Sequence, residues 1–168
     1  MFISKVFIFL FALLVSSAIA IPVRPNVGAV RQAAQAAKIV VKTKQSLRPA
    51  SGQAVFWSGS RPGENGPVSV KQDAEHFAKV HGKGTLEQTL KGHGVIIPKN
   101  SPHRTKMWEV ASKTYAQRAK GDTHVILGST RRPDSHYDTI EKPALMKNKK
   151  VTRLTEHNAH TGKATVVK

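Results

Sequence analysis

Two glutamates stand out among the ten acidic residues of this 168-residue chain. Glu87 lies in the segment TLEQTL (residues 85–90) and Glu141 in TIEKP (residues 139–143), each beside an apolar residue and near hydroxyl groups that can hold a carboxylate. A carboxylate held in this way can stabilise positive charge that develops during a reaction. The same local patterns also suit a helix capping box or a surface strand, so both interpretations stay open.

The chain contains two tryptophans, Trp57 and Trp108. The face of an indole ring attracts cations and stacks against flat aromatic groups. Combined with the two glutamates, the tryptophans favour glycosidic chemistry on a substrate that carries a flat aromatic group.

Other kinds of site are less well supported. The sequence has no cysteine, which excludes disulfides and thiolate chemistry. The histidines form no HExxH motif, so we expect no metal site. The segment GKGT (residues 82–85) departs from the phosphate-loop pattern because glycine follows its lysine, and no serine lies in a nucleophile elbow.

The spacing of apolar residues indicates which elements must position these groups. Val30, Ala34, Ala37 and Val41 recur at helical spacing and predict a helix over residues 27–46, ended by Pro49. Further helices are expected over residues 69–80 and 105–120, and strands over residues 124–127, 151–154 and 164–167. Helices followed by short strands predict a small α/β or α+β domain.

Residues 1–20 have the pattern of a secretory signal peptide, with a short apolar run followed by Ala18-Ile19-Ala20. We therefore expect a secreted, extracellular protein that begins at Ile21. Intact-mass measurement of secreted material checks this expectation, and retention of Met1 would contradict it. Residues 21–53 are then an N-terminal helical segment, either a docked helix or a removable pro-segment, and residues 54–168 are the working domain.

The formal net charge of the chain is +17. A basic surface attracts polyanions, anionic lipid headgroups and phosphorylated small molecules, although it also serves simply to keep a protein in solution. Two alternatives to a glycosidic enzyme follow from this charge. One is a secreted basic ribonuclease, and the other is a non-catalytic cationic protein that binds nucleic acid or membranes.

Four segments occur in a characteristic order: VFWS (residues 55–58), TLEQTLKG (85–92), WEVASKTYAQRAKGDTHVILG (108–128) and TIE (139–141). In this order they resemble the ADP-ribosyl cyclase / NAD glycohydrolase family, and the match covers about residues 55–154. The most specific part of the match is the TLE-x-TL-x-G segment (residues 85–92) followed by the predicted helix that carries Trp108 and Ser112. The resemblance implies an α/β fold with an N-terminal helical part and a small, mainly parallel sheet with flanking helices.

The resemblance assigns roles to the two glutamates. Glu141 corresponds to the catalytic glutamate of the family, which the family pattern places before a strand. We expect it to lie at a sheet edge and to be ionised at neutral pH, ready to meet the positive charge that develops on the ribose. Glu87 resembles the glutamate that contacts the nicotinamide carboxamide and governs how much product is cyclised or hydrolysed.

The resemblance also implies a set of substrate-binding residues. Trp57 and Trp108 correspond to the tryptophans that stack on the substrate ring, Ser112 to the helix serine near the phosphates and Ser58 to the serine after the first tryptophan. NAD is the implied substrate rather than a cofactor, and the expected activity is cleavage to nicotinamide and ADP-ribose with cyclic ADP-ribose as a minor product. We expect no stable membrane insertion, and secretion suggests a toxin or effector.

The chain departs from the family pattern at several positions. The family is rich in disulfides, whereas this chain has no cysteine. Gly59 stands where the family has an arginine two residues after the first tryptophan, and Arg61 is a candidate to replace that arginine. Ile96 or a neighbour replaces an acidic residue, and His136 replaces a hydroxyl residue five positions before Glu141.

Overall fold

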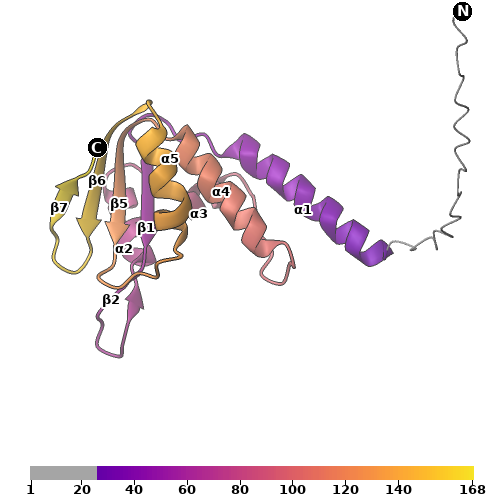
Figure 1. Cartoon of the computed structure of the whole chain (residues 1–168), viewed down its shortest axis with the longest axis horizontal. Helices are drawn as coiled ribbons and strands as arrows, with labels where there is room; N and C mark the ends of the chain where they lie inside the picture. Colours follow the sequence, from indigo (N-terminus) through magenta and orange to yellow (C-terminus); the bar gives the residue numbers. More distant parts are fainter. Residues whose placement is uncertain (1–25) are drawn as a thin grey trace, which may run out of the picture.

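The structure, a computed structural model, describes residues 26–168. The predicted signal peptide, residues 1–20, lies outside the described residues. A five-stranded sheet in the order β4-β1-β5-β6-β7 forms the centre of the molecule (Figure 1). Its first four strands run parallel to their neighbours, and β7 pairs antiparallel with β6. The predicted fold class, an α/β fold with a mainly parallel sheet, is confirmed.

The bounds of the strands place the sheet in the sequence. The five sheet strands are β1 (Ala54–Ser58), β4 (Gly84–Thr85), β5 (Gly121–Leu127), β6 (Val151–Asn158) and β7 (Ala164–Val166). Two short strands, β2 (Ser60–Arg61) and β3 (Val68–Ser69), form a separate antiparallel hairpin.

Helices cover both faces of the sheet, as its buried strands require. They are α1 (Val27–Ser46), α2 (Lys71–Val80), α3 (Leu86–Gly92), α4 (Arg104–Arg118), the π-helical turn η1 (Tyr137–Glu141) and α5 (Lys142–Lys147). The three long predicted helices are confirmed within two residues at each end, and α3 and α5 are additional. Among residues 26–168, no helix combines the length and apolar character needed to cross a bilayer.

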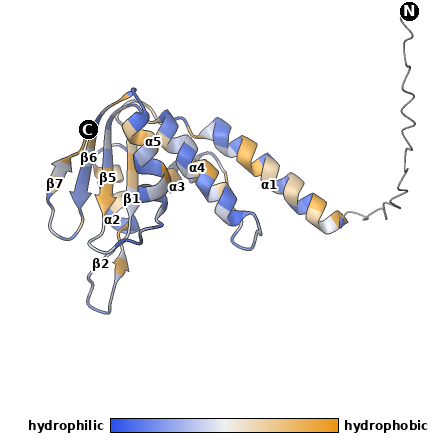
Figure 2. Cartoon of the chain, in the orientation of Figure 1, coloured by the Kyte–Doolittle hydropathy of each residue, from blue (hydrophilic) through white to orange (hydrophobic). Residues whose placement is uncertain are grey.

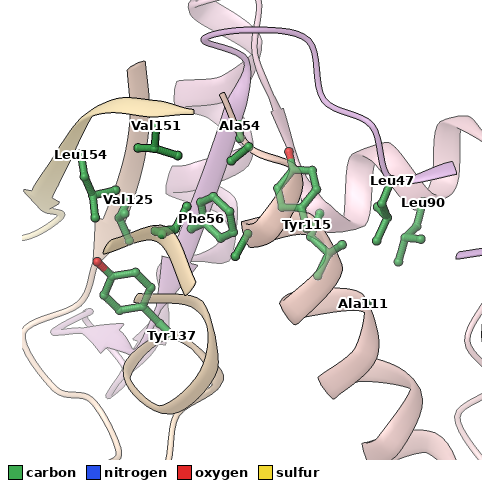
Figure 3. Close-up of a cluster of buried hydrophobic side chains, with 14 of the residues drawn as sticks. Leu47, Ala54, Phe56, Leu90, Ala111, Tyr115, Val125, Tyr137, Val151 and Leu154 are labelled. Carbon is green, nitrogen blue, oxygen red and sulfur yellow. The ribbon is translucent and has the colours of Figure 1, made fainter. Parts of the chain in front are cut away.

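The apolar residues of β1 and of the carboxyl half of β5 (Figure 2) are divided between two cores. Val55 and Ile126 face α2. Phe56 and Val125 face the larger core, where they pack with Tyr115, a residue of α4 (Figure 3). Because successive residues of a strand point to opposite faces, both faces of these strands are buried. This arrangement fixes β1 in the middle of the domain.

The structure corrects the expected buried face of α1. Val30, Ala34, Ala37 and Val41, whose spacing predicts the helix, are all exposed. The face that packs on the core instead carries the neighbouring residues Ala36, Ile39, Val40 and Thr43. The helix therefore has two apolar faces, and spacing alone does not tell which of them meets the domain.

The carboxyl end of α1 is anchored in the larger core. Leu47, its C-cap residue, is fully buried, and the guanidinium of Arg118 on α4 donates hydrogen bonds to the carbonyl oxygens of Lys44 and Leu47. The helix ends at Ser46, three residues before Pro49, because the residue preceding a proline disfavours helical geometry. This contact supports the interpretation of α1 as a docked helix. Removal of residues 21–53 as a pro-segment stays a prediction.

Candidate active site

A cavity of about 1000 Å³ opens beyond the carboxyl end of β1. The chain leaves β1 through α2 to reach β4 on one side, then passes through α3 and α4 to reach β5 on the other side. Such a reversal of strand order leaves a crevice outside the sheet, where open α/β sheets bind their ligands. The cavity is lined by all six residues predicted from the sequence: Trp57, Ser58, Glu87, Trp108, Ser112 and Glu141.

Glu141 is the last residue of η1 and lies against the end of β1. The expected position before a strand at a sheet edge is wrong, because a π-helical turn continues directly into α5 and β6 begins only at Val151. A π-helical turn is rare and is often found at functional sites. Here it turns the carboxyl group into the cavity wall, where Glu141 is 6% exposed.

Burial changes the protonation of Glu141. Loss of solvation raises its pKa to about 8, the charge of Glu87 contributes in the same direction, and the Ser112 hydroxyl acts in the opposite direction. A carboxyl group with this pKa holds its proton at neutral pH. Burial therefore argues against the expectation that Glu141 is ionised in the free protein at neutral pH.

Glu87 lies in the first turn of α3, which Thr85 and Gln88 begin with a capping box. Thr85 and Gln88 therefore form the capping box that the sequence suggested, and the Glu87 side chain takes no part in it. Its carboxylate accepts the indole N–H of Trp57, with Nε1 lying 3.2 Å from each oxygen. This bond fixes the edge of the Trp57 ring toward Glu87 and leaves the ring face for other contacts.

The two tryptophans reach the cavity from different sides of the sheet. Trp57 packs against the core beneath α2, whereas Trp108, on α4, packs against the larger core. Both are half-buried and both line the cavity. The Trp108 Nε1 atom is buried and has no hydrogen-bond partner within residues 26–168. Trp108 therefore contributes to packing as well as to the cavity wall.

Ser58 and Ser112 complete the predicted set. Ser58 ends β1 and is buried, and its carbonyl oxygen accepts a hydrogen bond from the amide of Gly128 at 2.8 Å. Ser112 is buried on the same helix as Trp108, one turn further along. Both serines line the cavity, and the Ser112 hydroxyl lies close enough to Glu141 to affect the pKa of that carboxyl group.

The backbone explains the glycine that departs from the family pattern. Gly59 has a φ of +89°, and a Cβ atom at this position would lie 2.4 Å from the carbonyl oxygen of Thr130. No larger residue fits there without a shift of the chain. Arg61 does not replace the missing arginine, because its guanidinium binds both carboxylate oxygens of Asp73 and lies outside the cavity lining.

Sequence reasoning missed the cations of this site. Arg104, Arg131 and Arg132 line the cavity together with Lys71. Arg131 is held by Asp138, which also accepts the hydroxyl of Ser135 at 2.6 Å. The pair Arg131-Arg132 is a visible signal in the sequence, but only the fold shows that the loop after β5 brings it to the mouth of the cavity.

Comparison with known proteins agrees with this architecture. No protein-family model and no curated protein sequence matches the chain. A solved structure of CD38 is 24% identical to it over 84% of this chain and 72% of that chain, with a TM-score of 0.53. The predicted resemblance to the ADP-ribosyl cyclases is therefore confirmed at the level of the fold.

Two other solved structures are more distant in shape. The Aplysia cyclase is 25% identical over 68% of this chain and 52% of that chain, and porcine CD38 is 19% identical over 76% and 71%, each with a TM-score of 0.47. The chain spans about half the length of the cyclase structures it matches.

Proposed function

We propose that this protein is an NAD glycohydrolase that splits NAD into nicotinamide and ADP-ribose, with cyclic ADP-ribose as a minor product. One observation carries the proposal. Six residues, scattered over residues 57–141 and selected from the sequence for this chemistry, line one cavity. The CD38-like fold supports the proposal, since the cavity lies beyond the carboxyl end of the inner strand β1, where open α/β sheets bind ligands.

The nicotinamide of NAD is a pyridinium cation. The ring faces of Trp57 and Trp108 are suited to hold it, because a cation over an indole gains about 0.5–2 kcal/mol. Cleavage of the bond to ribose develops an oxocarbenium ion, and nicotinamide leaves as a neutral molecule. A general acid is therefore not required for the leaving group. One carboxylate beside the ribose stabilises the cation until a water molecule adds to its carbon and loses a proton, which gives ADP-ribose.

The high pKa of Glu141 gives this carboxylate a way to respond to substrate. A cation placed beside a carboxyl group favours its ionised form. NAD binding then lowers the pKa of Glu141 and releases its proton, so that the negative charge appears where the ribose becomes positive. The Glu87 charge has the opposite effect on Glu141 in the free protein, and a bound pyridinium between them would relieve this repulsion.

The cationic rim fits the remaining part of the substrate. NAD carries a diphosphate, and Arg131 and Arg132 belong to the loop at the cavity mouth. Guanidinium groups bind phosphate oxygens through paired hydrogen bonds. Arg132 is largely exposed beside Asp134, so an anion can compete for it.

Release of nicotinamide from NAD by purified protein is the direct test. A ribonuclease would instead cleave RNA in a manner insensitive to NAD, and a non-catalytic binder would cleave neither molecule. Secretion and a role as a toxin or effector on another cell are part of the proposal, motivated by residues 1–20. Destruction of NAD in cells exposed to the purified protein would test that role.

Replacement of Glu87 by leucine is expected to change the ratio of cyclic to linear ADP-ribose while appreciable NAD consumption remains. The reason is that Glu87 lies beside the leaving group rather than at the ribose in the proposed arrangement. Chromatography of the products measures the ratio, and Glu87→Gln, which keeps an acceptor for the Trp57 N–H, is the control. Complete loss of turnover in a folded Glu87→Leu protein would make Glu87 essential instead.

Replacement of Trp57 by alanine is expected to raise the KM for NAD about tenfold, consistent with loss of roughly 1–2 kcal/mol of ring contact. Trp57→Phe keeps an aromatic ring but not the N–H donor, so its KM for NAD should lie between those of the original protein and Trp57→Ala. Trp108→Ala should show both a raised KM and a lower Tm, because Trp108 also packs against the larger core. An unfolded Trp57→Ala protein, judged by near-ultraviolet circular dichroism, would contradict the assignment.

A further inference from the structure

The outer face of α1 carries a continuous apolar strip. Its members are Val27, Val30, Ala34, Ala37 and Val41, all exposed. The three valines are 66%, 53% and 54% exposed, respectively. At 3.6 residues per turn, the five residues occupy about 80° of the helix circumference and about 20 Å of its length. The strip points away from the face that packs on the domain, and Figure 1 shows α1 extending outward from the sheet.

Basic residues border this strip on both sides. Arg31, Lys38 and Lys42 follow one edge, and Lys44 lies on the other, as the helical spacing requires. The helix has no acidic residue, and the first Asp or Glu of the whole sequence is Glu64. The Lys42 ammonium donates a hydrogen bond to the carbonyl oxygen of Gly94, which holds one border in place.

The cationic border continues into the domain at Lys44. This lysine helps to line a second cavity of about 850 Å³, in which Lys106, Lys113 and Lys147 also lie. The acidic residue of that lining, Glu109, is paired with Lys106 at 3.0 Å. The apolar strip therefore faces outward from a surface of strongly positive charge.

We infer that α1 docks the protein onto membrane surfaces that carry anionic lipids. The helix lies in the plane of the interface, its valines and alanines enter the headgroup boundary, and the flanking arginine and lysines contact lipid phosphates and carboxylates. A helix with an apolar strip bordered by cations is suited to such a surface. This attachment is peripheral and goes beyond the proposed cleavage of NAD.

Other occupants fit the strip less well. A second copy of the chain would bring two rows of like charges together, which opposes association. A nucleic acid would use the cations but would leave the exposed valines without a role. An anionic bilayer uses both features at once.

Vesicle sedimentation of the purified full chain, with the N-terminus it carries after expression, tests the inference. Vesicles of phosphatidylcholine with phosphatidylserine in a ratio of 3:1 are compared with vesicles of phosphatidylcholine alone. We expect at least tenfold stronger binding to the anionic vesicles, lost at high salt. Val30→Glu with Val41→Glu should weaken this binding at least tenfold.

The matched control is Val80→Glu with Val166→Glu, which makes the same change of charge at two valines exposed by 64% and 51% on α2 and β7. This control should retain most of the vesicle binding, and both double variants should keep the circular dichroism and NAD cleavage of the original protein. Arg31→Gln with Lys38→Gln should weaken binding and reduce its dependence on salt.

Three results would overturn the inference. The first is the absence of binding to anionic vesicles, with or without binding to duplex DNA. The second is an equal loss in the two double valine variants, which would reduce the effect to net charge. The third is a dimer, detected by light scattering, that disappears with Val30→Glu and Val41→Glu. Each of these results is independent of whether the protein cleaves NAD.

Discussion

Replacement of Glu141 by glutamine is expected to lower the kcat for NAD cleavage at least a hundredfold while the protein folds and binds NAD. Glutamine keeps the shape of the side chain and its hydrogen-bonding atoms but cannot become negative. Loss of a pre-organised group that stabilises transition-state charge costs on the order of 3–4 kcal/mol, which corresponds to about 10² to 10³ in rate. Nicotinamide release under saturating NAD measures the effect.

Glu109→Gln is the matched control for this experiment, because Glu109 lines the same cavity and the change is chemically identical. It sits on α4, paired with Lys106, and has no part in the proposed chemistry. Its kcat should remain close to that of the original protein. Near-normal nicotinamide release by the Glu141→Gln protein would refute both the mechanism and the assignment of Glu141 from the family resemblance.

The stability of the protein is expected to fall as the pH rises from about 4.5 to about 8, through the contribution of Glu141. In this window the folded protein keeps the Glu141 proton, since its pKa is raised to about 8, while the unfolded chain loses the proton near the ordinary pKa of 4.5 for a glutamate. The unfolded state thus binds fewer protons, and the free energy of unfolding declines by up to about 1.4 kcal/mol for each pH unit. Above pH 8 the contribution no longer changes.

Urea unfolding of the original and Glu141→Gln proteins at several pH values isolates this contribution. Other groups that titrate contribute equally to both proteins and cancel in the difference. The Glu141→Gln protein should gain stability relative to the original protein as the pH rises from 5 to 8. A difference that stays constant with pH would show that Glu141 titrates normally.

Local sequence patterns predicted most of the secondary structure. The long helices and the strands β5, β6 and β7 follow from apolar spacing, which depends on the geometry of the element itself. The buried face of α1 could not be predicted in this way, because the helix has one apolar face with Val30 and Val41 and another with Ile39 and Val40. Only the positions of α3 and α4, on which α1 packs, decide which of these faces is covered.

The candidate site shows the same division. The sequence alone determined which side chains are available: two tryptophans, two well-placed glutamates, no cysteine and a large excess of cations. Motif order then grouped Trp57, Glu87 and Glu141, although residues up to 84 positions apart have no local reason to meet. Their meeting depends on the strand order β4-β1-β5, which places the ends of these segments around one crevice.

The tertiary structure decided the environment of each group. Glu141 has a high pKa because the fold buries it near another carboxylate, and desolvation depends on neighbours that are distant in sequence. Gly59 excludes an arginine because the loop after β5 passes against its Cα atom. Arg131 reaches the cavity for the same topological reason. Residue types set the chemistry that is available, and long-range packing sets the charge, position and exposure with which it acts.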